Sequence, residues 1–450
     1  MTRPDTICAL ASGAPPSAIA LIRVSGPAVP SVIETLLNRS RLTPRRATRV
    51  RIIGADGSQV DDAVAVFFPA PNSFTGEDVL ELSVHGGRAV VDDVLDLLTA
   101  PNGVRLAEPG EFTRRAFEAG KLDLTQAEGI GDLIDAETRA QREQAIRQLD
   151  GHLSDRFSQW RQTLLEAMAM VEVAVDFPDE EDAPDFTHDD ARERIETLRR
   201  EIAMALDDGA LGEKVREGFR IALVGPPNAG KSSLLNRLAG REAAIVTELP
   251  GTTRDIVEVR LDVAGHLVLV QDTAGLRESD DRIESEGIRR ARHAAESADL
   301  RLLVWDATRP VEARDQLARE VLRAGDLIVA NKSDLEPRDD LAEDVSRETL
   351  PVSALTGAGF DRLVEALGAR ISQRITGRPA PLITRRRHRD RLSAAAQALS
   401  DASRLLEDGG PSELAAEDIR LAVRALSQLV GEIGVEDILG EVFSQFCIGK

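Results

Sequence analysis

The sequence has few cysteines, a deficit of positive charge and no long apolar run, and each shortage excludes a class of protein. Cys8 and Cys447 are the only cysteines in 450 residues, which excludes a disulfide framework and a structural zinc site built on several thiolates. Lys and Arg total 56 against 77 for Asp and Glu, and the net charge of −21 excludes broad, salt-driven coating of nucleic acid. No apolar run approaches the ~20 residues that span a membrane. We therefore expect a cytoplasmic protein in a reducing compartment.

The chain divides into four segments by residue pattern, and its length suits about three domains. Residues 1–121 carry short β-type runs broken by Gly, Pro and Asn, which predicts an α+β domain. Residues 122–217 and 376–450 have apolar residues spaced by three and four, as helices do. Residues 218–375 alternate β-runs with helical segments, which is typical of an open parallel sheet. The pattern predicts a helical bundle with an α/β domain inserted into it.

The first helical segment carries most of the negative charge. A single apolar stripe from Ile146 to Val171 predicts one long helix. Residues 176–190 follow, with eight acidic residues in fifteen, and a second helix is expected after them. Residues 122–217 together hold 11 basic and 25 acidic residues, net −14.

A phosphate-binding loop follows the β-run Phe219–Val224. Residues 225–232 have the pattern GxxxxGKS, and the helical segment SLLNRLAG comes directly after it. Glycines let backbone N–H groups face the phosphates, and the helix N-terminus adds partial positive charge. We expect Lys231 to reach the β- and γ-phosphates and the Ser232 hydroxyl to bind Mg²⁺. The nucleotide contacts expected from this loop are Asn228, Ala229, Gly230, Lys231, Ser232 and Ser233.

Three further motifs follow in order, each after a β-run, and with the first they predict a GTPase. In DTAG, Asp272 would hold Mg²⁺ through water and the Gly275 N–H would meet the γ-phosphate. In NKSD, the Asp334 carboxylate can accept two N–H groups of guanine, a pattern that adenine does not match. The motif SAL fits the loop whose backbone meets the guanine O6. The contacts expected from these motifs are Asp272, Thr273, Ala274, Gly275, Asn331, Lys332, Asp334, Ser353, Ala354 and Leu355.

The residue after DTAG bears on how GTP is hydrolysed. It is Leu276, whereas Ras-like proteins use a glutamine there to orient the attacking water. Positive charge and positioning of the water must therefore come from elsewhere. Residues 244–255, AIVTELPGTTRD, contain a threonine for Mg²⁺ and enough carbonyls to surround a monovalent cation.

The whole chain resembles one bacterial family at specific motifs. These are DTICAL, IRVSG, NSFTGEDVLEL, HGG, EPGEFTRRAFEAGKLDLTQAEGIGDLIDA, DFPDEE, the phosphate loop through PGTTRD, DTAGLRE, NKSD and FCIGK. On these residues the chain resembles the tRNA-modification GTPases called MnmE or TrmE. The resemblance implies an N-terminal domain that looks like a folate-binding fold and makes a homodimer (1–121). It also implies a helical domain in two parts (122–217 and 376–450) with a Ras-like G domain inserted (218–375).

The resemblance implies ligands and catalytic residues as well. The family's K⁺ ligands fall on Asn228, Thr247, the backbone of Leu249, and Thr252, and its Mg²⁺ ligands fall on Ser232 and Thr253. Its contacts to formyl-tetrahydrofolate fall on Arg23, Glu81, Lys121 and Lys450. Its catalytic glutamate falls on Glu284, and Cys447 belongs near the folate. We take as candidate catalytic residues Glu284, Lys231 and Cys447.

The function that the resemblance implies is a K⁺-stimulated GTP hydrolase acting in tRNA modification. With the flavoprotein MnmG in a heterotetramer, such proteins install an aminomethyl-type (carboxymethylaminomethyl) group at C5 of the wobble uridine. The one-carbon donor is 5-formyl- or methylene-tetrahydrofolate. The alternative is a ribosome-assembly GTPase acting as an RNA-binding switch, but no KH domain or second G domain follows residue 375. A third possibility is a one-carbon transferase that GTP only regulates.

Some residues allow a plainer interpretation, and some depart from the family. Without the surrounding motifs, Arg23, Glu81 and Lys121 are ordinary surface charges. Cys447 is a structural thiol or a reactive one. The basic run at residues 385–391 either binds tRNA phosphates or is a solvated helix start. The departures from the family pattern are residues 13–18, where a Gly-rich segment is expected, Pro226 in place of Arg, and Phe74 in place of Tyr.

Overall fold

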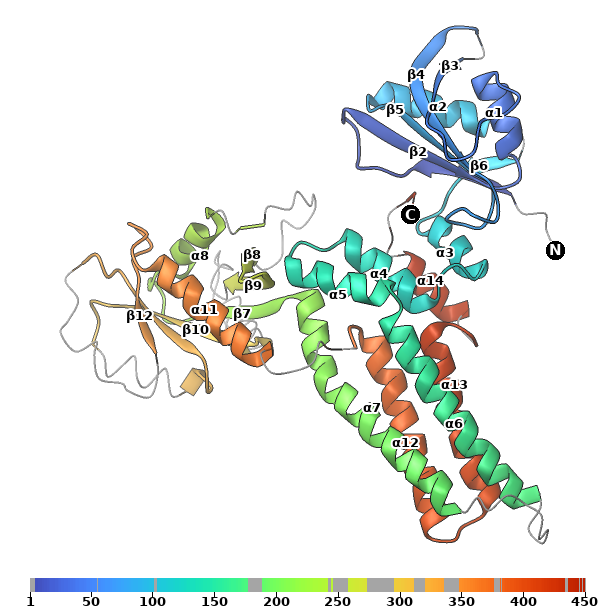
Figure 1. Cartoon of the computed structure of the whole chain (residues 1–450). Coiled ribbons are helices and arrows are strands. Elements are labelled where there is room, and N and C mark those ends of the chain that lie inside the picture. Colours follow the sequence, from blue (N-terminus) through green and yellow to red (C-terminus); the bar gives the residue numbers. More distant parts are fainter. Residues whose placement is uncertain are drawn as a thin grey trace, which may run out of the picture. The chain divides into compact units, whose positions relative to one another are not determined.

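The computed structural model describes residues 5–54, 56–100, 103–176, 188–241, 244–245, 258–272, 295–310, 320–335, 348–375, 381, 383–433, 436–444, 446 and 448–449. The chain forms two compact units, each assembled from separated stretches of sequence (Figure 1). The first comprises Met1–Gly131, Gln148–Ala169 and Ala416–Lys450, and the second comprises Asp132–Arg147 and Met170–Ala415. Among the described helices, none is both long enough and apolar enough to cross a membrane.

A six-stranded sheet organises the N-terminal part of the first unit. The strands are β1 (Thr6–Leu10), β2 (Ile19–Ser25), β3 (Thr48–Ile53), β4 (Gln59–Phe68), β5 (Val79–His85) and β6 (Val104–Leu106). Their order is β3-β4-β5-β2-β1-β6, and the neighbours are antiparallel except for β1 and β6.

Two helices, α1 (Val29–Leu37) and α2 (Arg88–Thr99), cover one face of this sheet. Strand residues alternate between the two faces, so Ile22 and Leu82 are buried with the helices while Arg23 and Glu81 lie on the opposite face. The face without α1 and α2 is therefore the one that presents the charged pair. Cys8 lies in the covered core, where burial raises the pKa of its thiol to about 11.

The helical part of the first unit is drawn from both ends of the chain. Its elements are α3 (Glu111–Glu118), the start of α4 (Leu124–Ile134), α6 (His152–Asp176), α13 (Ser412–Val430) and α14 (Glu436–Ser444). Leu124 packs with Val442 and Phe443 in one apolar cluster. Arg161 on α6 donates a hydrogen bond from Nε to the Ser427 hydroxyl on α13, at 3.0 Å.

The second unit contains the α/β domain. Its six strands are β7 (Phe219–Val224), β8 (Glu258–Val263), β9 (His266–Asp272), β10 (Leu300–Asp306), β11 (Leu327–Asn331) and β12 (Thr349–Pro351). The order is β12-β11-β10-β7-β9-β8, and only β8 and β9 run antiparallel. Every residue of β10 and β11 is buried, as expected for parallel strands covered on both faces.

Helices from flanking segments complete the second unit. The elements are α5 (Arg139–Leu149), α7 (His188–Glu217), α8 (Lys231–Ala239), α11 (Phe360–Ile375) and α12 (Arg386–Glu407). Helices α7 and α12 pack along each other (Figure 1). Gln141 on α5 donates to the carbonyl of Arg216 at 2.8 Å, which joins α5 to the end of α7.

The prediction of one long helix from Ile146 to Val171 is wrong. Helix α5 ends at Leu149 and α6 begins at His152, with Gly151 between them at φ +89°. Glycine adopts this left-handed conformation without the steric cost that a side chain brings. The apolar spacing of four from Leu149 to Leu153 continues across the break, so periodicity alone does not reveal it.

The expected fold class is confirmed: an α+β region, helices from two parts of the chain, and a P-loop α/β domain. The β-run expected at Phe219–Val224 occurs as a strand with the same bounds. Strand β3 was not expected from the sequence. Its exposed Arg49 and Arg51 alternate with the buried Val50 and Ile52, so it contains no continuous apolar run.

Candidate functional site

The phosphate loop leaves β7 at Val224 and enters α8 at Lys231. Gly225 has φ +142°, and a Cβ there would lie 2.2 Å from the carbonyl oxygen of Val304. Gly230 has φ +93°, and a Cβ there would lie 2.1 Å from Nδ2 of Asn331. Gly225 is therefore required by a close backbone contact and Gly230 by its close contact with the Asn331 side chain. The loop opens directly onto the N-terminus of α8, where free N–H groups favour anions.

Lys231 and Ser232 are placed at the start of that helix. The Lys231 ammonium is buried and donates to the carbonyl oxygens of Gly225 and Pro226 at 2.8 and 2.9 Å. The Ser232 hydroxyl donates to Oδ2 of Asp272, the last residue of β9, at 2.6 Å. A hydroxyl and a carboxylate side by side are hard oxygen donors, so this pair fits Mg²⁺.

The guanine motifs are joined to the phosphate loop by Asn331. Its Nδ2 donates to the carbonyl of Ala229 at 2.8 Å, and its Oδ1 accepts the backbone N–H of Ala354 at 3.0 Å. The Ser353 hydroxyl donates to Oδ1 of Asp334. Side chains at the ends of β11 and β12 thus hold three loops in one arrangement, with the Asp334 carboxylate at its edge.

Lys332 of the same motif is paired with Asp306 at the end of β10. The ammonium lies 2.6 Å from Oδ2 of Asp306, and Thr308 donates to Oδ1 of the same carboxylate at 2.7 Å. Burial opposes ionisation of Asp306, but the hydrogen bonds from Lys332 and Thr308 outweigh it and hold the pKa of this carboxyl below its usual value.

Arg237 on α8 contacts the loop after β12 and was not expected from the sequence. Its guanidinium donates to the carbonyl oxygens of Leu355 and Thr356 at 3.2 and 2.8 Å. Gly357 has φ +90°, and a Cβ there would lie 2.2 Å from Nη2 of Arg237. The arginine therefore braces the loop that begins at Ser353. In the sequence it looks like any exposed helical charge.

A second candidate site, which we call the N-terminal site, lies on the face of the N-terminal sheet opposite α1 and α2. Arg23 on β2 pairs directly with Glu81 on β5, with Nη2 2.8 Å and Nε 3.0 Å from Oε1. The guanidinium also lies over the rings of Phe74 and Phe112, at 5.4 and 5.7 Å from their centroids. Both members of the pair are more than three-quarters buried, so this is not an ordinary surface ion pair.

Two other segments approach this face. A Cβ on Gly76 would lie 3.5 Å from Cε of Lys121, which places the lysine beside the loop that carries Phe74. The C-terminal segment reaches β1: Ile448 forms a β-bridge with Pro109, and Gly449 packs against the carbonyl of Leu10. The next residue back in β1, Ala9, is the register partner of Arg23.

The family models match almost the whole chain. Residues 6–121 match "GTP-binding protein TrmE N-terminus" and residues 124–447 match "MnmE helical domain". The "tRNA modification GTPase MnmE" of Hyphomonas neptunium is 53% identical over 450 residues, covering 100% of both chains. That of Parvibaculum lavamentivorans is 49% identical over 447 residues, covering 99% of this chain and 100% of the relative. The chain belongs to the MnmE family of tRNA modification GTPases.

Membership of the MnmE family confirms the expected GTPase activity in tRNA modification. Among solved structures, the chain is similar to the G domain of the T. maritima FeoB iron transporter. The two are 26% identical with a TM-score of 0.27, over 34% of this chain and 98% of that one.

Several of the expected MnmE site residues lie outside the described part of the chain. They are Thr247, Leu249, Thr252, Thr253, Thr273, Ala274, Gly275, Glu284, Cys447 and Lys450, with Leu276 beside them. Of the expected K⁺ ligands, the structure describes Asn228, which is exposed at φ +62° in the phosphate loop. Ser233 is exposed on the first turn of α8, next to Ser232.

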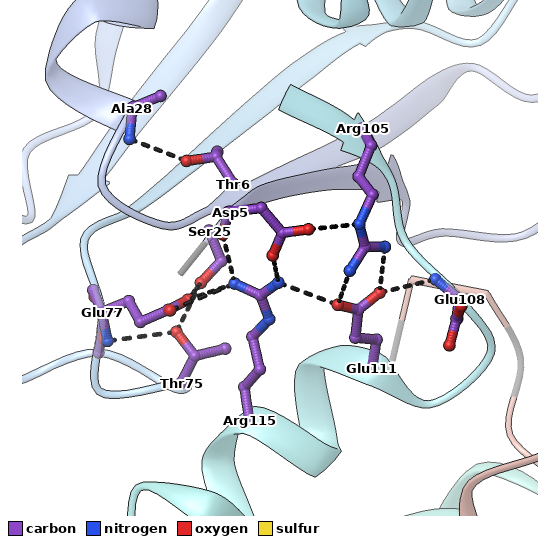
Figure 2. Close-up of polar contacts among 11 residues, drawn as sticks. Asp5, Thr6, Ser25, Ala28, Thr75, Glu77, Arg105, Glu108, Glu111 and Arg115 are labelled. Carbon is purple, nitrogen blue, oxygen red and sulfur yellow. Dashed lines mark hydrogen bonds and ion pairs between the residues drawn. The ribbon is translucent and has the colours of Figure 1, made fainter. Parts of the chain in front are cut away.

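A network of charged side chains joins Glu77, in the loop after Phe74, to residues of β6 and α3 (Figure 2). Arg115 on α3 donates to Asp5 at 2.8 Å, to Glu111 at 2.9 Å and to Glu77 at 3.2 Å. Arg105 on β6 donates to Glu111 at 2.6 Å. The network therefore ties the entry to β1, the end of β6, helix α3 and the loop after Phe74 into one frame.

The basic run at residues 385–391 is largely paired with carboxylates of the same unit. Arg385 lies 2.7 Å from Asp132, and both side chains are more than four-fifths buried. Arg389 lies 3.0 Å from Glu213 on α7. These two arginines hold α12 to neighbouring segments of the unit, which leaves fewer charges of this run for an RNA phosphate.

Proposed function

We propose that this MnmE-family GTPase is stimulated by K⁺ and that Asn228 contributes a ligand to the cation. Two features support the proposal. Leu276 has no hydrogen-bonding group to orient water, and residues 225–232 contain no arginine to stabilise the charge that develops between the β- and γ-phosphates. An arginine in that role is worth about 10³–10⁵ in rate. Asn228 is exposed in the same loop that leads into the buried Lys231, so a cation held there would add a second positive charge to the phosphate site.

The roles of the chain's own groups in this reaction are as follows. Lys231 would neutralise the β- and γ-phosphate oxygens, Ser232 would bind Mg²⁺ directly, Asp272 would hold it through water, and Asp334 would fix the base. Thr247, Leu249 and Thr252 complete the K⁺ site, Thr253 is the second Mg²⁺ ligand, and Glu284 orients the water. Mg²⁺ and K⁺ supply electrostatic stabilisation of the phosphate oxygens when bound. Water attacks the γ-phosphorus, and GDP leaves with its β-phosphate oxygen carrying the electron pair of the broken bond.

The test is a comparison of GTP hydrolysis rates in K⁺ and in Na⁺ at several protein concentrations. The wild type should be faster in K⁺, with a rate per molecule that rises with concentration because G domains of two copies close on each other. Asn228→Ala should lose the stimulation. Asn236→Ala is the matched control, an exposed asparagine on α8, and should retain it. Equal wild-type rates in both salts at every concentration would contradict the proposal.

We also propose that the N-terminal site binds a tetrahydrofolate derivative, either 5-formyl- or methylene-tetrahydrofolate. Arg23 and Lys121 offer positive charge, Glu81 offers a carboxylate, and Phe74 and Phe112 offer ring faces. This chemistry fits a ligand with a flat polar ring and carboxylates. Lys450 is included in the same set on the family resemblance. Cys447 is a further candidate on the same segment. The bound folate supplies a one-carbon unit for the uridine.

Calorimetry with 5-formyl-tetrahydrofolate tests this site. Arg23→Ala should abolish measurable binding and leave GTP hydrolysis unchanged, because the two sites lie in different units. Arg88→Ala, at the start of α2 in the same domain, should leave both unchanged. Retained folate binding together with lost GTP hydrolysis in Arg23→Ala would overturn the assignment of the two sites.

The complete activity that we propose is installation of a carboxymethylaminomethyl group at C5 of the wobble uridine of tRNA. It requires the flavoprotein MnmG in a heterotetramer with a homodimer of this chain in the cytoplasm. In domain terms, residues 1–121 bind folate and dimerise, residues 122–217 and 376–450 form the helical domain, and residues 218–375 form the G domain. Modification of tRNA by this chain with and without the flavoprotein tests the pairing, because product should require both proteins.

A further inference from the structure

One short segment has a charge opposite to that of the molecule as a whole. Residues 38–51 contain six arginines and no acidic residue, in a chain of net charge −21. We name these residues the arginine edge: Arg39, Arg41, Arg45, Arg46, Arg49 and Arg51. All six are exposed, and the side chains of Arg49 and Arg51 are 75% and 70% accessible.

The arginine edge follows one border of the N-terminal sheet. It starts after α1, where Asn38 takes a left-handed conformation at φ 47°, and ends in β3, the first strand in the sheet order. Val50 and Ile52 point into the core, so Arg49 and Arg51 point together to the other face. The six charges are therefore gathered along a single loop and strand rather than spread over the domain.

Little of this charge is neutralised by the protein. Asp62 on β4 lies 3.0 Å from Arg49 and 3.8 Å from Arg51, and it is the acidic partner of both. The neighbouring Asp61 is buried and engaged by His85, at 2.7 Å from Nδ1.

The other four arginines have no carboxylate partner in the described part of the chain. Arg39 bonds a backbone carbonyl at 3.4 Å. Arg45 bonds the carbonyl of Asn72 and lies 5.5 Å from the centroid of the Phe68 ring. The side chains of Arg41 and Arg46 form no hydrogen bond or ion pair with the residues that the structure describes.

The surface between the arginines is polar. Among residues 38–51, the large apolar side chains Leu42 and Val50 are buried, and the exposed residues besides arginine are Asn, Ser, Thr, Pro and Ala. Protein interfaces are built around apolar or aromatic centres, which this segment does not expose. Exposed guanidinium groups without such a centre suit the phosphate oxygens of a nucleic-acid backbone, which they bind in bidentate fashion.

We propose that the arginine edge binds the phosphate backbone of the tRNA substrate. The inference rests on the proposed function, in which tRNA binds this chain, and it names the surface that carries the binding. Each phosphate contact releases condensed counterions, so added salt weakens binding. The logarithm of the association constant should fall by about 0.7–0.9 per phosphate contact for each tenfold rise in salt concentration. The surface gives affinity and orientation without recognising bases.

The experiment measures tRNA binding by the full chain over a series of KCl concentrations. The test variant is Arg41→Gln/Arg46→Gln/Arg51→Gln, which leaves the contacts of Arg39, Arg45 and Arg49 in place. The matched control is Arg114→Gln/Arg404→Gln/Arg420→Gln, which removes the same charge from three exposed helical arginines. A third variant, Arg386→Gln/Arg391→Gln, tests the rival basic run.

The test variant should bind tRNA about tenfold or more weakly. The slope of log K against log salt concentration should become shallower by about 2 to 3. The control and the rival-run variant should stay within about twofold of wild type. GTP hydrolysis and the melting profile should be unchanged in all three, which shows that the fold is retained. If the test variant keeps the wild-type affinity and salt dependence, the assignment of tRNA binding to the arginine edge is overturned, while the proposed function is not affected.

Two other outcomes also contradict it. If the wild type hydrolyses GTP but binds no tRNA even at low salt, the proposed function fails, and the assignment fails with it. If the test variant binds tRNA normally but sediments as a smaller species than the wild type, the arginine edge is a contact between copies of this chain.

Discussion

The nucleotide site and the N-terminal site are built in different ways. In the nucleotide site, Asn331, Arg237 and Lys231 bond backbone carbonyls, and the three loops follow parallel strands of one sheet. In the N-terminal site, Arg23 and Glu81 meet in the middle of an antiparallel sheet. The first site is held by local backbone geometry that short motifs encode. The second depends on side chains brought together from distant parts of the chain.

The largest effect that separates the two sites is expected from Asp334→Asn. The amide no longer accepts both N–H groups of guanine, so GTP should bind about 100-fold or more weakly, and xanthosine triphosphate should bind better than in the wild type. Folate binding should be unchanged. Nucleotide competition measures the first effect and calorimetry the second.

Asp361→Asn serves as the control for that variant. Asp361 is exposed and pairs with Arg241, away from the base, so this change should leave GTP affinity at the wild-type value. Undiminished GTP affinity in Asp334→Asn would remove Asp334 from the guanine site.

Arg115→Ala tests whether the N-terminal site depends on its network of distant charges. Removing one member of a largely buried charged group should lower the free energy of unfolding by about 3 kcal/mol. This corresponds to about 100-fold faster amide hydrogen exchange in β1 and β6. Strands β10 and β11 in the other unit should exchange as before. Arg114→Ala, the adjacent exposed arginine paired with Glu118, should change exchange by less than about threefold. Equal exchange in both variants would show that the network contributes no stability.

The sequence revealed the four motifs of the nucleotide site but little of the side-chain contacts that support either site. The four motifs could be found because each stands at a fixed spacing after an apolar β-run. The cage of Phe74 and Phe112 around Arg23 could not be found, because the rings lie 51 and 89 residues away from Arg23 in the sequence and only the tertiary fold brings them to it. The break at Gly151 preserved the apolar spacing, and the charged β3 lacked an apolar run. Arg23 and Glu81 were found through the family resemblance.

A smaller effect is expected from Arg237→Ala, which tests how far the nucleotide site depends on a side chain outside the motifs. Losing two hydrogen bonds to the carbonyls of Leu355 and Thr356 should weaken GTP binding by about tenfold. The KM should rise while kcat stays near wild type, because the phosphates are untouched. Arg237→Lys should restore part of the affinity. Arg241→Ala, just beyond the same helix, is the control; equal KM values for both alanine variants would refute the bracing role.

The smallest effect is expected when the pH is lowered, and it should appear only in the strands held by the charged network of Arg105, Glu111 and Arg115. Burial opposes ionisation of Glu111, but hydrogen bonds from Arg105, the Glu108 N–H and Arg115 outweigh it and hold the pKa of this carboxyl below its ordinary 4.5. A depressed pKa contributes stability that is present above pH 4.5 and is lost as the pH falls through the lower, folded value. Amide hydrogen exchange in β6, after correction for the intrinsic pH dependence of exchange, should therefore become faster below pH 4.5.

Glu111→Gln sharpens that prediction. The variant should exchange faster at neutral pH and show a smaller additional change on acidification, because the titrating carboxyl is gone. An acid response in the variant as large as in the wild type would assign the effect to other carboxyls.

The most direct test of two separate sites serving one reaction is the yield of C5-modified wobble uridine in tRNA. It is measured by mass spectrometry after incubation of the full chain with the flavoprotein, folate and nucleotide. We predict product from the wild type with GTP, from Asp334→Asn with xanthosine triphosphate but not GTP, and none from Arg23→Ala although it hydrolyses GTP. Wild-type yield from Arg23→Ala would contradict the account.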